Sequence, residues 1–187
     1  KIDGLSNTTM HNGKLKVDTD GLGFLCKKVH SFSNETFVAW NTTNGYTSDG
    51  SDEPILKGYR YYVVDLGQGL SVDVYSLHMD AETTDADNAA RVSQLQQLVA
   101  AIKASDNKRP IIVMGDTNCR YTRDPLTTEF INAINADSRF NVHDPWVDFM
   151  WEGVPPVQAP GSLMVDALGQ QKGEVVDKTF YINNTDA

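Results

Sequence analysis

The feature that most constrains the fold of this chain is a strand, an amphipathic helix and a second strand in direct succession. The segment LSVDVYSLHMD (70–80) begins with alternating apolar and polar residues, which predicts a strand with one apolar face. A helix is expected over residues 85–103, where apolar side chains recur at helical spacing after Thr84, a suitable N-cap. The run IIVM (111–114) is rich in β-branched residues and too short for a helix before Gly115, so it predicts a strand covered on both faces. This βαβ order predicts an α/β fold in which the two strands are parallel.

Further elements are expected on both sides of this unit. The segment KGYRYYVVDL (57–66) and the strand at 70–80 are separated by Gly67-Gln68-Gly69, the composition of a tight hairpin. A second helix is expected to open at Asp124-Pro125, with Pro125 suited to its first turn. The remaining expectations are a loop with one edge strand (1–20), a short buried strand (20–28), a mobile or substrate-facing loop (41–53), an ordered loop (143–162) and a last strand, GEVVDKTFYIN (173–183), with Asp177 in its middle.

Length, composition and net charge limit the classes of protein to which the chain can belong. The chain has 187 residues and is 40% hydrophobic, which fits one globular domain without a linker. Its formal net charge is −9, so the summed field repels polyanions and disfavours unaided binding to nucleic acid or to an anionic membrane. A divalent cation held in an acidic cleft can reverse that effect locally.

The cysteines and the possible glycan-acceptor asparagines give information about the cellular compartment of the protein. Cys26 and Cys119 lack the spacing of a zinc site, and they form either one disulfide or two buried thiols. Asn-x-Thr triplets occur at Asn7, Asn34, Asn41 and Asn183. They favour an exported protein, secreted or periplasmic or at the cell surface, although an Asn- and Thr-rich bacterial surface protein contains them by composition. No stretch approaches the roughly 18 apolar residues that span a bilayer, and without an initiator methionine or a signal peptide we expect a processed or trimmed chain.

Polar residues follow both strands of the βαβ unit. His78 and Asp80 follow the first strand, and Asp116 and Asn118 follow the second. The carboxyl ends of neighbouring parallel strands meet at one edge of a sheet, where α/β proteins place their chemistry. A carboxylate can hold a metal or orient water, an amide can fix that water or a phosphate oxygen, and a histidine can donate to the leaving oxygen. The set suits hydrolysis of a phosphoester, whereas the alternative for Asp116 and Asn118 is ordinary turn chemistry.

Three other residues have open interpretations. Asp80 either holds a metal or only accepts hydrogen bonds from the nearby backbone. Arg91 either reaches a substrate phosphate from the helix or belongs to a solvated helix face. Asp177 interrupts an apolar strand, where an unpaired carboxylate is costly to bury, so it requires a partner or an exposed position.

Four short motifs, taken together, resemble the endonuclease/exonuclease/phosphatase superfamily. YSLHMDA is similar to the family's NTHLDA element, and VMGDTN is similar to its GDFN element. DADNAARVSQLQQLVAAI resembles the family helix with its Ala-Arg-x-x-Gln pattern, and EVVDKTFY resembles the strand that carries DRI or DKI. Their order and spacing agree with the family over residues 20–183.

The resemblance implies a two-sheet α/β sandwich of the deoxyribonuclease I-like type and a magnesium- or manganese-dependent phosphoesterase. It implies that His78 contacts the phosphate, that Asp116 orients water or faces the metal, and that Asn118 is its companion amide. Asp177 is then the carboxylate that orients a second histidine. The family's N-terminal strand, its Gln-Glu metal-ligand element and its C-terminal Ser-Asp-His element have no counterpart in residues 1–187, so we expect one partial catalytic domain.

Two classes of function stay open at this point. A phosphoesterase is the first, acting on a small phosphodiester, a phospholipid head group or an inositol phosphate rather than on nucleic acid, because the chain is acidic and has no basic stripe. The second is a binding or structural relative that keeps the fold without the chemistry, since the end elements are not present.

Overall fold

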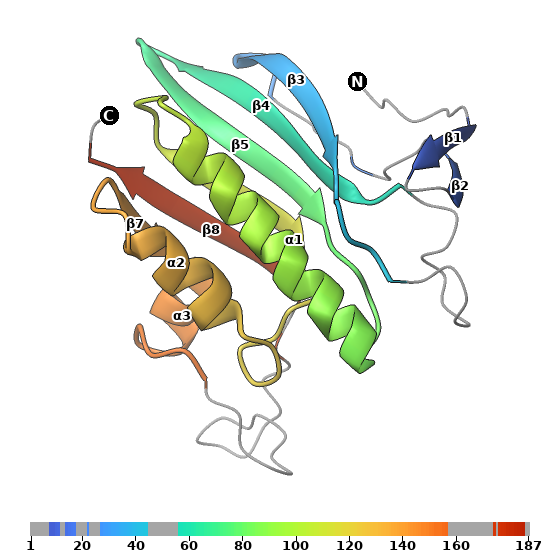
Figure 1. Cartoon of the computed structure of the whole chain (residues 1–187). Coiled ribbons are helices and arrows are strands. Elements are labelled where there is room, and N and C mark those ends of the chain that lie inside the picture. The colour runs from blue at the N-terminus through green and yellow to red at the C-terminus, as the bar shows by residue number, and fades with distance from the viewer. Residues whose placement is uncertain are drawn as a thin grey trace.

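The computed structural model describes residues 8–11, 14–17, 22, 27–44, 56–156, 174 and 176–185. The elements in these ranges are β1 (Thr8–His11), β2 (Lys14–Val17), β3 (Ser31–Ala39), β4 (Gly58–Gly67), β5 (Leu70–His78), α1 (Asp85–Ala104), β6 (Ile111–Asp116), the π-helix η1 (Thr127–Asn132), α2 (Ala133–Asn135), β7 (Phe140–His143), α3 (Pro145–Met150) and β8 (Asp177–Asn184). Figure 1 shows α1 and the α2–α3 region on one side of a long twisted sheet.

The sheet has six strands in the order β3-β4-β5-β6-β8-β7. Strands β5 and β6 are parallel and are connected by α1, which confirms the predicted βαβ unit. The other neighbours pair antiparallel, including the β4–β5 hairpin predicted from Gly67-Gln68-Gly69. The α/β class is therefore confirmed, with the described residues forming one six-stranded layer and a separate β1–β2 pair.

Helix α1 begins where the sequence predicts. Thr84 is its N-cap, and Thr84 and Asp87 form a capping box in which each side chain accepts a hydrogen bond from the other's backbone N–H. Leu95, Leu98 and Ile102 are at most 1% exposed, so the apolar stripe of the helix is buried against the sheet. Of the helices in the described ranges, none is long and apolar enough to cross a membrane.

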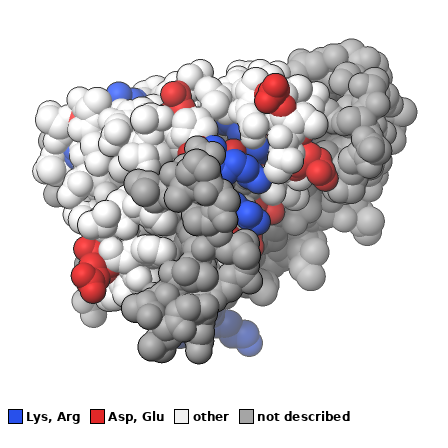
Figure 2. Space-filling view, turned by 90° about the horizontal axis from the view of Figure 1, so that it is seen from below, with Lys and Arg blue, Asp and Glu red and all other residues white. Residues whose placement is uncertain are grey.

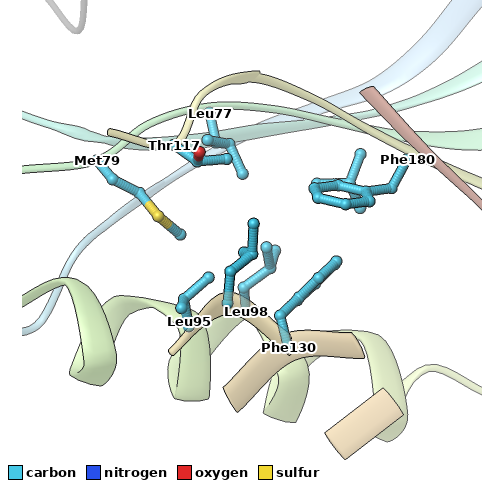
Figure 3. A pocket seen from close by; sticks show the side chains of 9 residues that line it. Leu77, Met79, Leu95, Leu98, Thr117, Phe130 and Phe180 are labelled. Carbon is cyan, nitrogen blue, oxygen red and sulfur yellow. The ribbon is translucent and has the colours of Figure 1, made fainter. Parts of the chain in front are cut away.

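The main core lies between α1, η1 and the sheet. Figure 3 shows Leu77, Met79 and Phe180 from the sheet side facing Leu95 and Phe130 of the helices, around a gap with no room for a water molecule. Burying side chains of this size stabilises the fold by about 1.5–3 kcal/mol each. This core fixes the sheet edge at which β5 and β6 end.

The apolar face predicted for β5 is present, since Val72 and Val74 belong to a buried cluster. On the other face Asp73 is 1% exposed and accepts a hydrogen bond from Arg109 Nε at 2.6 Å. A buried carboxylate paired with a guanidinium allows a polar residue on the helix-covered face. In β6, Val113 is buried but Met114 is 37% exposed, so the expectation of a strand covered on both faces is wrong.

Several boundaries also differ. The expected loop at 143–162 contains α3, because Asp144 caps a helix that begins with Pro145. Asp177 is the first residue of β8 rather than its middle. The chain before residue 20 holds two paired strands, β1 and β2, instead of one edge strand. Most of the segments expected as a buried strand (20–28) and a mobile loop (41–53) fall outside the described residues.

Candidate active site

Three candidate residues form a row across three neighbouring strands. His78 at the end of β5 is the register partner of Asp116 in β6, and Asp116 is the partner of Asp177 in β8. His78 Nε2 lies 3.8 Å from Asp116 Oδ2, and about a third of each side chain is exposed. Asp177 is exposed. Because alternate residues of these strands face the helices, the row points to the opposite face of the sheet.

Gly115 permits the close approach of the two strands that carry His78 and Asp116. Its φ is +129°, and a Cβ atom there would lie 2.1 Å from the carbonyl oxygen of Leu77. No L side chain fits this position without moving the backbone of β5. The glycine of the GDTN motif therefore has a structural reason for its identity, namely the spacing of the row.

Asn118 lies directly beside the row. Its backbone N–H donates to Asp116 Oδ1 at 2.8 Å, and its side-chain Nδ2 donates to the carbonyl oxygen of Met79 at 3.0 Å. Its φ of +49° is one that asparagine tolerates better than most residues. The amide thus ties the loop after β6 to the segment after β5, and it faces the same sheet edge as His78.

Asp80 occupies an interior position. It is 1% exposed, its Oδ2 accepts from the backbone N–H of Asn44 at 2.5 Å, and its own N–H donates to Gln94 Oε1 at 3.0 Å. These contacts support the alternative in which Asp80 holds nearby backbone, whereas its role as a metal ligand stays a prediction.

Arg91 is also interior, contrary to both sequence interpretations. Its side chain is 1% exposed, and Nη1 donates to the carbonyl oxygens of Asp80, Ala81 and Glu82 at 2.8–3.1 Å. Nη2 lies 3.2 Å from Asp124 Oδ1 in the loop after β6. The guanidinium is therefore neither a solvated surface group nor a group that can reach a phosphate, and it joins the two loops that flank the row.

Sequence reasoning missed other residues that hold the segment after β5. Lys57 is 2% exposed and its Nζ donates to the carbonyl oxygen of Met79 at 2.9 Å. Gln94, three residues after Arg91, accepts from the Asp80 N–H and donates to the carbonyl oxygen of Thr42 at 2.8 Å. The Ala-Arg-x-x-Gln pattern contained this signal, because Arg91 and Gln94 lie one helical turn apart and bind the same peptide segment.

A buried cation on the other face of β8 was missed as well. Lys178 is 3% exposed, and its Nζ lies 3.4 Å from Glu174 Oε1 and 4.7–4.8 Å from the ring centroids of Tyr121 and Trp146. Burial lowers the pKa of Lys178, while Glu174 opposes that shift. Glu174 also accepts from Thr122 Oγ1 at 2.8 Å. These contacts hold the loop after β6 against the strand that begins with Asp177.

The carboxylates of the row can bind a hard cation whose other ligands come from water and from the substrate. Mg²⁺ commonly binds one or two carboxylates together with waters and substrate phosphates. Asp116 and Asp177 are register partners on one face, so a cation near them also offsets the repulsion between two like charges. No group of three or more His, Cys, Asp and Glu side chains that could hold a metal occurs among the described residues.

One face of the molecule carries charges of both signs. Figure 2 views the molecule from below relative to Figure 1, and it shows a small group of basic side chains near the middle with acidic side chains around it. The described part of this face therefore has no broad basic stripe of the kind that tracks a nucleic-acid backbone.

Comparison with solved structures identifies the fold. SmcL aligns with a TM-score of 0.52 and 18% identity, covering 83% of this chain and 51% of SmcL. D. rerio TDP2 complexed with a single-strand DNA product aligns with a TM-score of 0.52 and 17% identity, covering 84% of this chain and 55% of TDP2. The chain has a deoxyribonuclease I-like fold. The fold that the four motifs imply is thereby confirmed.

Sequence relatives agree with this fold. The sphingomyelinases of Mycobacterium bovis and Mycobacterium tuberculosis are each 29% identical over 164 residues, which is 87% of this chain. No family profile matches the chain. The chain spans 29% of the length of these sphingomyelinases, and about half of the length of the two solved structures.

Proposed function

We propose that this deoxyribonuclease I-like chain is part of a divalent-metal-dependent phosphoesterase that hydrolyses a phosphodiester with an activated water. The observation that carries the proposal is the row of His78, Asp116 and Asp177 on one sheet edge, with Asn118 beside it. The named relatives support it, since sphingomyelinases and TDP2 share the fold. We propose residues 1–187 as one portion of a single catalytic domain.

Each residue of the row has a proposed task. Asp116 orients the attacking water or faces the metal, and Asn118 fixes that water or a phosphate oxygen. His78 donates to the phosphate or to the leaving oxygen, where negative charge develops in the transition state. Asp177 orients a further proton donor at the edge. A bound Mg²⁺ or Mn²⁺ supplies Lewis-acid stabilisation of the phosphoryl oxygens, with Asp116 as its ligand from this chain.

The proposed substrate is a small phosphodiester, a phospholipid head group or an inositol phosphate rather than a nucleic acid. The net charge of −9 and the mixed charge on the face shown in Figure 2 support this choice, because nucleases gain affinity from many phosphate contacts to Lys and Arg. The sphingomyelinase relatives support a lipid head group, whereas the TDP2 structure with single-strand DNA is the reason to keep DNA as a comparison substrate.

An exported location is also proposed. Asn34, Asn41 and Asn183, which begin three of the four Asn-x-Thr triplets, are exposed, as an acceptor for a glycan must be. Peptide mapping of protein secreted by a eukaryotic host tests this proposal. Glycan on these asparagines supports entry into the secretory path, whereas fully unmodified peptides speak against it.

Substitution of the row tests the proposed chemistry. We expect His78→Ala and Asp116→Ala in the full-length protein to lower turnover of a phosphodiester by at least about a hundredfold, because each removes a group acting on the reacting phosphate. His143→Ala is the matched control, since His143 forms another histidine–carboxylate pair, with Nδ1 3.9 Å from Asp148 Oδ2, outside the row. Wild-type turnover in both row variants would exclude the proposed roles.

A further inference from the structure

A cleft with a volume of about 300 Å³ lies between the sheet and one side of α1. Its floor consists of Tyr59, Tyr61 and Tyr75 on β4 and β5, and α1 contributes Ala101 to its wall. In Figure 1 the ribbons of β3 and β4 lie to one side of α1. Small-molecule sites have volumes of about 300–1,000 Å³, so the cleft has room for a small ligand.

The cleft is separate from the row. Tyr75 belongs to the core on the helix-covered face of the sheet, together with Leu77 of the same strand. Successive residues of a strand point to opposite faces, so His78 points away from the cleft. A ligand in the cleft therefore does not reach the residues proposed for hydrolysis.

The tyrosine floor has a fixed shape. Tyr61 and Tyr75 are register partners with ring centroids 5.2 Å apart, and the rings of Tyr59 and Tyr75 are 5.6 Å apart. The Tyr61 hydroxyl donates to Asp73 Oδ1 at 3.0 Å and accepts from Arg109 Nη2 at 3.2 Å. Because these groups are already ordered, a ligand that binds to the floor has little ordering of side chains to offset.

Two hydroxyl groups of the floor have no partner. Tyr59 and Tyr75 are each 5% exposed, and among the residues that the structure describes neither hydroxyl takes part in a hydrogen bond. Burial raises the pKa of both phenols above its usual value, so both are neutral at pH 7 and can donate as well as accept. A buried hydroxyl without a partner is costly, and a polar ligand in the cleft can supply that partner.

Further hydrogen-bonding groups surround the floor. Asn107 donates from Nδ2 to the Tyr61 hydroxyl at 3.2 Å and to Asp73 Oδ2 at 3.3 Å, which leaves its Oδ1 as an acceptor. The Ser105 hydroxyl accepts from the Asn107 N–H at 3.3 Å and is left able to donate. Thr36 of β3 supplies another hydroxyl. Donors and acceptors from three separate segments thus surround an aromatic floor.

The lining specifies the charge of the ligand. None of the described side chains that line the cleft is ionised at neutral pH. Asp73 and Arg109, which bind the Tyr61 hydroxyl, are already paired with each other at 2.6 Å. A charged ligand would lose its hydration without gaining a counterion, whereas an uncharged polar ligand would not meet this cost.

We propose that this cleft is a binding site for one neutral hexose. A pyranose ring has apolar C–H faces that pack on aromatic rings, and a rim of hydroxyl groups that donate and accept hydrogen bonds. These properties match the tyrosine floor, the unpaired hydroxyls of Tyr59 and Tyr75 and the polar groups around them. The inference does not depend on the proposed phosphoesterase function, because the cleft and the row lie on opposite faces of the sheet.

Saturation-transfer NMR titration of the full-length protein with D-glucose, D-galactose and D-mannose tests the inference. We expect at least one of these hexoses to bind, and its dissociation constant to rise about three- to tenfold in Tyr75→Phe and in Tyr59→Phe, because each change removes one hydrogen bond and keeps the ring. Tyr181→Phe is the matched control, since Tyr181 is 41% exposed in β8 and does not line the cleft. It should bind as the wild type does.

The two cleft variants should unfold at the wild-type temperature, since the hydroxyl that each one loses has no partner in the fold. Weaker binding by these stable variants would therefore reflect the lost contact with the sugar. Binding of none of the three hexoses, or equal binding by the wild type and both cleft variants, would overturn the site. Tighter binding of glucose 6-phosphate or of tetramethylammonium than of any hexose would overturn the assignment of an uncharged ligand.

Discussion

Gly115 permits the close approach of the strands that carry His78 and Asp116. We expect Gly115→Ala to lower the free energy of unfolding by about 3 kcal/mol or more, because its Cβ meets the Leu77 carbonyl at 2.1 Å in a backbone conformation that suits glycine. Gly69→Ala is the control. Gly69 also has a positive φ, +81°, but a Cβ there has nothing within 4 Å, so the expected cost is about 1–2 kcal/mol. Equal costs in urea unfolding would contradict the steric explanation.

Asp87 makes the stability of the fold at the start of α1 depend on pH. Burial alone would raise the pKa of its carboxyl, but hydrogen bonds from Thr84 and Asn44 outweigh burial and lower that pKa below its usual value. The unfolded chain therefore binds the proton more readily, and protonation favours unfolding. The stabilisation is complete above pH of about 4 and is lost as pH falls through the native pKa. Urea unfolding of wild type and Asp87→Asn should differ at pH 7, with a difference that shrinks as pH falls below about 4, and a constant difference would contradict this.

Cys119 is expected to be inert in the folded chain. It is a free, buried cysteine, and burial raises the pKa of its thiol to about 12, so almost no thiolate forms at pH 8. In a Cys26→Ser variant, we expect Ellman's reagent to label Cys119 only after denaturation. Labelling of the native protein within minutes would show that the thiol is accessible. Of the two cysteine states that the sequence leaves open, this structure has the free thiol at Cys119.

At the scale of elements, the loops after β5 and β6 are joined through α1. We expect Arg91→Met to lower the free energy of unfolding by about 3–5 kcal/mol, because three carbonyl oxygens lose their donor and the buried Asp124 keeps only Arg123 as a cationic partner. Arg60→Met is the control, since the Arg60–Glu35 pair is partly exposed and its loss should cost no more than about 1 kcal/mol. Similar costs for both variants would show that the buried guanidinium does not join the loops as described.

The elements differ in how far the sequence determines them. The βαβ unit, the hairpin and the N-cap of α1 were predictable because local spacing and turn chemistry specify them. Strands β3 and β7 were not predicted. Strand β3 lacks a strict apolar alternation, the alternation of β7 covers only four residues, and both strands lie at the edges of the sheet. Helix α3 carried a signal that was overlooked, the Asp144-Pro145 start, because the aromatic and proline content of the segment favoured a loop.

The residues of the candidate site also differ in how far the sequence predicts their positions. His78, Asp116 and Asn118 could be placed at one sheet edge from the order of strands alone, since parallel neighbours end together. The positions of Arg91 and Asp80 could not, because burial depends on which loop covers which side chain. A charged residue on an amphipathic helix is exposed by default, and only the tertiary structure shows that three carbonyl oxygens meet Arg91.

At the scale of the whole molecule, the chain combines a rigid sheet edge with an acidic overall charge. The net charge of −9 disfavours polyanions at a distance, while a local cation at Asp116 would attract a single phosphate. This combination is the physical basis for preferring a compact phosphodiester over a long nucleic-acid backbone.

The most direct test of the central claim is hydrolysis of bis-p-nitrophenyl phosphate by the full-length protein with Mg²⁺, with Mn²⁺ and with EDTA, beside its His78→Ala variant. We expect turnover with either metal, its loss in EDTA, and at least about a hundredfold reduction in the variant. Turnover that persists in EDTA or in the variant would contradict the proposed chemistry. No turnover under any condition, together with none on sphingomyelin or single-strand DNA, would favour a relative that keeps the fold without catalysis.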